Sequence, residues 1–178
     1  MIRYSTFIFL FITCSFYSFS QKYWQQEVNY NINVTLDDKS HVLYGDISFD
    51  YINHSPDTLN KIYIHLWPNA YKDKTSELAK QLYRNNDDEL YFGESKNRGY
   101  IDSVSFSIDH QPVSIQFPYE STDICLIELA TSLDPGSQIN IQTPFRVKVP
   151  SGDISRLGHI GQSYQITQWY PKPAVYDK

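Results

Sequence analysis

The 178-residue sequence predicts an all-β fold, namely an antiparallel β-sandwich or saddle with one short helix. Three observations lead to this prediction. Apolar and polar residues alternate along most of the chain, polar turns separate the alternating runs, and only one segment has helical periodicity. About seven or eight such runs fit a single sandwich domain. We therefore expect more than about 40% strand, against a usual 20–25%.

The opening strand has the clearest alternation. Asparagines and a threonine separate its apolar residues, which are Val28, Tyr30, Ile32, Val34 and Leu36. After a polar turn at 37–40, Val42 and Tyr44 continue the apolar face. The parity then changes, because the next apolar positions are Ile47, Phe49 and Tyr51. This change predicts a β-bulge at Gly45–Asp46.

The third strand has bulky residues on both faces, so we expect it to be covered on both sides. Its two faces are Ile62, Ile64 and Leu66 against Tyr63, His65 and Trp67. The helix is expected from Ser76 to about Tyr83, with Thr75 as its N-cap. Its apolar stripe consists of Leu78, Ala79 and Leu82. Residues 85–99 are expected to form an irregular polar loop.

Short strands resume after this loop. Their alternating apolar residues are Val104, Phe106 and Ile108, then Val113, Ile115 and Phe117. A strand follows from Ile124 to Leu129, in which Cys125 is interpreted as a small apolar core residue. A turn at 134–137 leads to alternating residues on both sides of Pro144, which are Ile139, Ile141, Phe145, Val147 and Val149.

Residues 1–20 have the order of a secretory signal peptide. Arg3 precedes an apolar run, and the small residues Ser18 and Ser20 follow it. The run is short for a bilayer span, which needs about 20 residues. We expect cleavage after Ser20 and a secreted or periplasmic mature protein with no membrane span. A buried N-terminal strand and a membrane anchor are the alternatives.

Composition and motifs restrict the possible functions. The net charge of −5 gives no basic footprint of the kind that binds nucleic acid. The five histidines form no H-E-x-x-H motif, and the sequence has no G-x-S-x-G elbow and no phosphate-binding loop. We therefore assign no catalytic residue and no metal ligand within this chain. The chain ends inside an aromatic segment, 165–178, which we interpret as an end that precedes a further domain.

Four segments together resemble the N-terminal domain of the aminopeptidase N family of zinc metallopeptidases, which includes leukotriene A-4 hydrolase. They are the opening hairpin 30–49, the segment Leu59–Tyr71 and especially its part from Ile64, the turn and strands at 133–150, and Gln168–Pro171 together with Ala174–Asp177. The resemblance covers nearly all of residues 23–178. The sequence is similar in detail to secreted members from Bacteroidetes-type bacteria.

The resemblance implies that residues 21–178 are the N-terminal β domain of a secreted aminopeptidase. This domain would pack on a C-terminal zinc catalytic domain beyond Lys178. The full-length protein would bind zinc and remove N-terminal residues from peptide substrates. The 178-residue chain alone is expected to be inactive and to bind no zinc.

The resemblance also implies a role in holding the substrate's free α-amine, for which family members use a Gln or Glu of this domain. An ungapped alignment on the aromatic–proline step places Gln162 at that position, with Gln165 and Gln168 as rivals. The segment 159–162 departs from the commoner Thr-Gln-x-Gln/Glu pattern. Trp169 and Tyr170 are expected at or near the interface with the catalytic domain.

A freestanding secreted β-sandwich that binds a carbohydrate or a protein partner, without catalysis, is the alternative function. In that case Trp67 and Trp169 would provide the stacking or contact surface. Reading the gene beyond Lys178 separates the two hypotheses.

Overall fold

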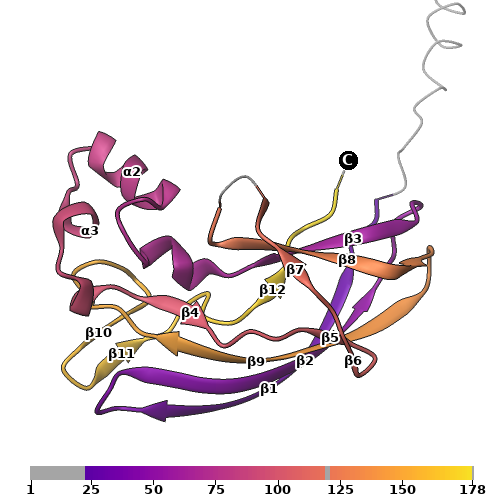
Figure 1. Cartoon of the computed structure of the whole chain (residues 1–178), viewed down its shortest axis with the longest axis horizontal. Coiled ribbons are helices and arrows are strands. Elements are labelled where there is room, and N and C mark those ends of the chain that lie inside the picture. Colours follow the sequence, from indigo (N-terminus) through magenta and orange to yellow (C-terminus); the bar gives the residue numbers. More distant parts are fainter. Residues whose placement is uncertain (1–22, 119–120, 178) are drawn as a thin grey trace, which may run out of the picture.

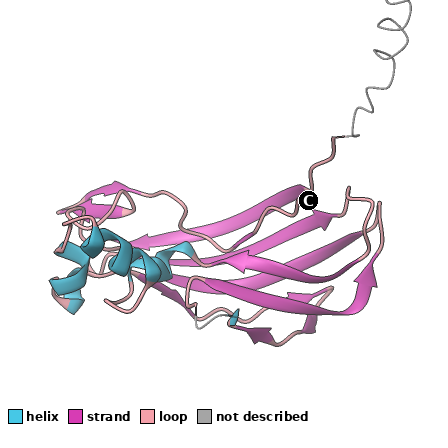
Figure 2. Cartoon of the chain, turned by 90° about the horizontal axis from the view of Figure 1, so that it is seen from above, coloured by secondary structure: helices cyan, strands magenta, loops and turns pink. Residues whose placement is uncertain are grey.

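Two antiparallel β-sheets lie on either side of one hydrophobic layer (Figure 1). The computed structural model describes residues 23–118 and 121–177, so the predicted leader at 1–20 lies outside the described residues. Among these described residues, strands make up 44% and helices 14%, and only one helix has seven or more residues. The all-β prediction is therefore confirmed. Figure 2 shows the helices gathered at one end of the sandwich.

Sheet A has six strands in the order β1-β2-β9-β5-β6, with β4 also paired to β9. Their bounds are β1 (Glu27–Asp37), β2 (Val42–Ile52), β4 (Tyr100–Asp102), β5 (Ser107–Ile108), β6 (Gln111–Pro112) and β9 (Gln138–Lys148). Sheet B has the order β12-β3-β8-β7. Its strands are β3 (Leu59–His65), β7 (Ile115–Gln116), β8 (Ile124–Leu133) and β12 (Lys172–Pro173). A separate hairpin joins β10 (Gly158–Ile160) to β11 (Ser163–Gln165).

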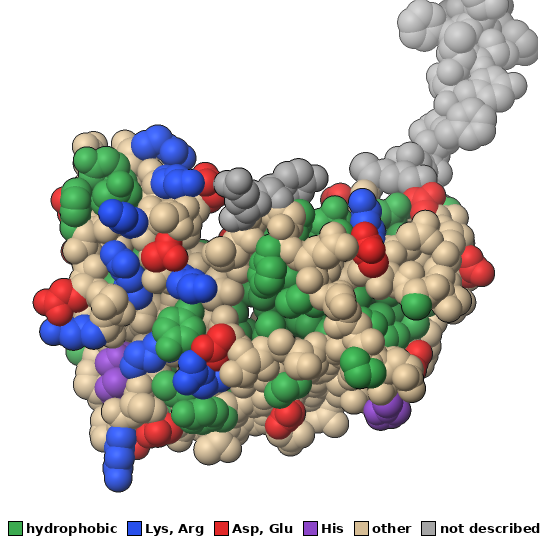
Figure 3. Space-filling view, viewed as in Figure 1, with side chains coloured by type: hydrophobic (Ala, Val, Ile, Leu, Met, Phe, Trp, Pro, Cys, Tyr) green, Lys and Arg blue, Asp and Glu red, His purple; other side chains and the backbone are tan. Residues whose placement is uncertain are grey.

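The hydrophobic layer is built from the inward residues of the long strands, as the alternation predicts. Sheet A contributes Ile141, Phe145 and Val147 of β9, and sheet B contributes Ile64 and Ile127. All of these side chains are buried. In Figure 3 hydrophobic side chains show through the middle of the face, beyond the end that carries the helices.

The predicted bulge at Gly45–Asp46 is wrong, because β2 runs through it without a register shift. Val34 pairs with Gly45 on one side, and Gly45 pairs with Phe145 on the other. Gly45 stands on the core face, where a Cβ would lie 2.4 Å from Cζ of Phe145. The Phe145 ring fills the space of the missing side chain. A glycine at a core position therefore hid an unbroken alternation.

Pro144 lies inside β9, although proline removes a hydrogen-bond donor from a strand. The strands on the side of β9 away from β2 explain why the proline is tolerated. β5 pairs with β9 as far as Gln142, and β4 pairs with it from Arg146 onward. Pro144 therefore falls in the gap between two short strands, while its pairing to β2 is kept. Nearby, the Ser105 N–H donates to Thr143 Oγ1 over 2.8 Å and bridges the gap.

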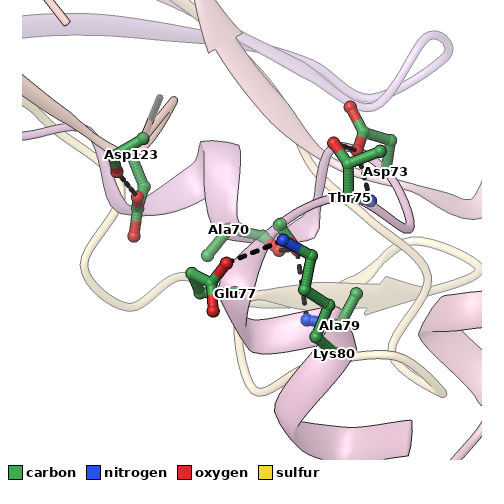
Figure 4. A network of polar contacts seen from close by, with 9 residues as sticks. Ala70, Asp73, Thr75, Glu77, Ala79, Lys80 and Asp123 are labelled. Atoms are coloured by element: carbon green, nitrogen blue, oxygen red, sulfur yellow. Dashed lines mark hydrogen bonds and ion pairs between the residues drawn. The ribbon is translucent and has the colours of Figure 1, made fainter. Parts of the chain in front are cut away.

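The predicted helix is confirmed as α2 (Glu77–Arg84), but its N-cap is Ser76 and not Thr75. Ser76 Oγ accepts from the Ala79 N–H at 3.1 Å. The Thr75 hydroxyl instead donates to Asp73, as Figure 4 shows. The Thr75 side chain thus hydrogen-bonds within a local turn one residue before the cap.

The loop predicted at 85–99 is more ordered than expected. It contains α3 (Glu89–Phe92) and the 3₁₀ turn η3 (Ser95–Asn97). Leu90 of α3 is buried, which anchors the segment. A further 3₁₀ turn, η2 (Trp67–Tyr71), follows β3. No helix within 23–118 or 121–177 is long and apolar enough to cross a membrane.

Cys125 is buried in β8, as predicted, and burial raises the pKa of its thiol to about 12. It is therefore a core residue and not a reactive thiolate. In β3 the inward residues Ile62 and Ile64 are buried, whereas Tyr63 and His65 on the other face are half-buried. The expected cover on both faces is thus complete on only one of them.

Candidate functional site

The tail of the chain, residues 150–177, holds the residues singled out for substrate binding. Its hairpin β10–β11 is joined by the two residues Gly161 and Gln162. Gly161 has φ +56°, a backbone region that glycine adopts without strain. Glycine at the first central position of a two-residue hairpin favours a type II′ turn. The sequence therefore places Gln162 at the exposed tip of this hairpin.

Close backbone packing fixes the hairpin to the end of sheet A. The His159 N–H donates to Pro150 O at 3.0 Å, and the Gly152 N–H donates to His159 O at 2.9 Å. A Cβ on Gly158 would lie 2.7 Å from the Cα of Gly152 and from Ser155 O. Two glycines are therefore needed for this approach, which explains the glycine-rich composition of the segment.

A second contact joins the hairpin to the turn between β1 and β2. His41 Nδ1 lies 2.6 Å from the hydroxyl of Tyr164, and that hydroxyl donates to Asp38 O at 3.2 Å. The His41 and His159 rings stack with their centroids 3.5 Å apart. His41 has φ +54°, so the turn itself directs the ring toward the hairpin. We call His41, His159 and Tyr164 the histidine–tyrosine cluster.

The charge environment favours a neutral His41. Partial burial makes the largest contribution to lowering the pKa of His41. The neighbouring His159 and Lys148 lower it further, while Asp37 and Asp38 oppose the shift. The Lys148 ammonium group donates to Ser40 O at 2.6 Å in the same turn. The cluster thus combines two imidazoles with a nearby cation, an arrangement that protonation would disturb.

Gln162 lies beside a carboxylate. Its Nε2 donates to Asp38 Oδ2 at 3.4 Å, a long hydrogen bond between two exposed side chains. Among the described residues, no hydrogen bond uses the amide oxygen of Gln162 or the second carboxylate oxygen of Asp38. Both oxygens can therefore accept a hydrogen bond from a ligand. A neutral acceptor next to a carboxylate suits an ammonium group.

The rival glutamines lie elsewhere along the tail. Gln165 is on β11 and lines a shallow pocket of about 420 Å³ with residues such as Ser155 and Tyr164. Gln168 is exposed between β11 and Trp169, with φ +49°. Of the three glutamines, only Gln162 makes a hydrogen bond to a carboxylate in the described structure.

The expected interface aromatics pack partly on the domain itself. The rings of Trp169 and Phe145 lie 5.8 Å apart, and Tyr170 meets Tyr30 edge-on at 5.4 Å. Trp169 and Tyr170 are both half-buried. Trp67 is also half-buried, stacked on His65 at 4.9 Å. Neither Trp67 nor Trp169 is freely exposed in the described structure.

The histidine–tyrosine cluster and Asp38 were not predicted from the sequence. His41 and Tyr164 are 123 positions apart, and no local spacing links them. A positive φ at a non-glycine turn residue is visible only in the structure. The single sequence signal was the glycine-rich composition of 151–162, which marked the tail without identifying its partner.

Among residues 23–118 and 121–177, no group of three His, Cys, Asp or Glu side chains is placed to hold a metal ion. No family model matches the sequence, and a search of curated proteins finds no match.

Proposed function

We propose that this chain is the N-terminal β domain of a secreted zinc metallo-aminopeptidase, which helps to bind the α-amine of peptide substrates. The observation that carries the proposal is the position of Gln162 at a hairpin tip beside Asp38. The two-sheet fold is compatible with it. The sequence resemblance supplies the reaction class, and the zinc chemistry belongs to a catalytic domain outside this chain.

The chemistry of binding follows from the acceptors. A peptide's free N-terminus is an ammonium ion with three donors. Gln162 Oε1 and the Asp38 carboxylate can accept two of them, while the hairpin contact already holds both side chains together. A charge-assisted hydrogen bond contributes about 1.5–3 kcal/mol when it is shielded from water. Both side chains are exposed in this chain, so the full effect requires cover by the catalytic domain.

The half-buried aromatics offer the surface for that cover. Trp169 and Tyr170 lie between the hairpin and β12 in the sequence, and their rings contact Phe145 and Tyr30. Aromatic side chains contribute large contact area at interfaces. The proposal requires that the docked domain also reach the hairpin tip, where it would remove Gln162 and Asp38 from water and strengthen their hold on an ammonium group.

The gene downstream of Lys178 gives the first test. An H-E-x-x-H motif on a following helix, with a further Glu ligand, supports the proposal. A stop codon directly after Lys178 contradicts it and favours a binding module without catalysis.

Kinetics of the full-length enzyme give the second test. Gln162→Ala should lower kcat/KM for a peptide with a free α-amine by about 10- to 150-fold. The N-acetylated form of the same peptide should be nearly unaffected, because it has no ammonium group. Gln165→Ala and Gln168→Ala serve as matched controls. Equal losses on both peptides would assign Gln162 only a structural role.

A further inference from the structure

Strand β1 forms an open edge of sheet A. It pairs with β2 along its whole length, and no strand among residues 23–118 and 121–177 pairs with its other side. Figure 1 shows it as the outermost long strand of the sandwich. An eleven-residue edge presents a row of unpaired N–H and C=O groups, which is a template for another strand.

The strands at the ends of the other sheet edges are short. β6, β7 and β12 each have two residues, and β6 and β12 contain a proline. β12 also contains Lys172. Short length, proline and lysine are the features by which natural sheets avoid pairing at their edges. β1 has none of them, and its only charged residues are Glu27 and Asp37 at its two ends.

The inward face of β1 is incompletely covered. Tyr30, Val34 and Leu36 are on the same side of sheet A as the buried Phe49 and Leu43. Nevertheless they remain 39%, 45% and 41% exposed. Apolar side chains at an open edge would be covered by a neighbouring strand with the same alternation.

We infer that β1 pairs antiparallel with β1 of a second copy of this chain, around a two-fold axis at Ile32. The inference is independent of the proposed function. In this register, apolar side chains pair with apolar side chains on the inner face, and polar side chains pair with polar side chains on the outer face. Val28 faces Leu36, Tyr30 faces Val34 and Ile32 faces Ile32 on the inner face, while Asn31 faces Asn33 on the outer face.

The strand's own pattern selects the second copy as the occupant. An isologous interface requires that the same patch complement itself after a two-fold rotation. The alternation of β1 reads the same in both directions and carries no charge from 28 to 36. Only the ends are unfavourable, because Glu27 would face Asp37. Both carboxylates have local partners, namely His54 for Glu27 and the Ser40 hydroxyl for Asp37.

The test is the mass of the purified chain by sedimentation at increasing concentration. The unmodified chain should form a dimer. Asn31→Lys with Asn33→Lys places two pairs of like charges across the axis, and it should weaken dimerisation by about tenfold or more. The matched control is Ala130→Lys with Thr131→Lys, which adds the same charge at exposed positions of β8 and should dimerise normally.

A charge-swapped partner tests the pairing itself. Asn31→Asp with Asn33→Asp should weaken dimerisation in the same way when alone, and an equimolar mixture with the lysine variant should form a heterodimer. Circular dichroism of each variant verifies that the fold is kept. A wild-type chain that stays monomeric at all concentrations overturns the inference, as does a lysine variant that dimerises like wild type. Recovery of the chain only in complex with a different protein's strand at this edge also overturns it.

Discussion

Strand β9 and the hairpin β10–β11 are close in sequence but are held by different interactions. β9 lies between β2 and the short strands β4 and β5, with Ile141, Phe145 and Val147 buried in the core. The hairpin is held by backbone hydrogen bonds, glycine contacts and the histidine–tyrosine cluster, mostly at the surface. Such a region can open without unfolding the sandwich. We therefore expect the hairpin to open more readily than the sandwich.

The largest effect is expected in the scaffold. Phe145→Ala should lower the free energy of unfolding by about 3–5 kcal/mol, because it leaves a cavity between the sheets. Denaturant unfolding followed by circular dichroism measures this loss. A loss no larger than that caused by removing a hairpin contact would contradict the expected difference between β9 and the hairpin.

The contact between Gly45 and Phe145 sharpens this prediction. Gly45→Ala should destabilise the chain, since the new Cβ would lie 2.4 Å from the Phe145 ring. The same substitution in the Phe145→Ala background should cost little, because the ring is gone. A double-mutant cycle measures the coupling, and additive effects would argue against direct contact.

The sequence predicted the scaffold well because its information is local. The alternation in β1 and the inward residues of β9 identified strands and faces. The Gly45 error arose because the residue that fills its space, Phe145, is far away in the chain. The hairpin was harder to predict, since its partners Asp38 and His41 belong to a turn over a hundred positions earlier.

A smaller effect is expected from the cluster. Tyr164→Phe removes the hydroxyl that contacts His41 and Asp38 O. Each such hydrogen bond contributes about 0.5–1.5 kcal/mol. Amide hydrogen exchange should therefore speed up in β10 and β11, while exchange in β2 and β9 should not change. Faster exchange throughout the sandwich would show that the two regions unfold together.

The pH dependence is expected to be smaller still and confined to the hairpin. Because the pKa of His41 is lowered in the closed hairpin, opening restores its ordinary value near 6.5. The neutral cluster therefore stabilises the closed form above about pH 6.5, and this contribution is lost as the pH falls through the folded pKa. Hairpin exchange, corrected for intrinsic rates, should be faster at about pH 5.5 than at pH 7.5.

A matched variant separates His41 from the nearby carboxylates. His41→Phe keeps a ring in the stack but does not titrate, so it should flatten the pH dependence of the hairpin. Asp37 and Asp38 oppose the shift on His41, and they remain in this variant. An unchanged pH profile would assign the effect to other groups.

We propose above that Gln162 and Asp38 form an acceptor for a free α-amine. An NMR titration of the purified chain with a short peptide amide, free or N-acetylated, tests it most directly. The free peptide should shift the backbone amide signals around Gln162 and Asp38, and Gln162→Ala should abolish those shifts. Equal shifts with the acetylated peptide, or shifts confined to other regions such as Gln168, would contradict the claim.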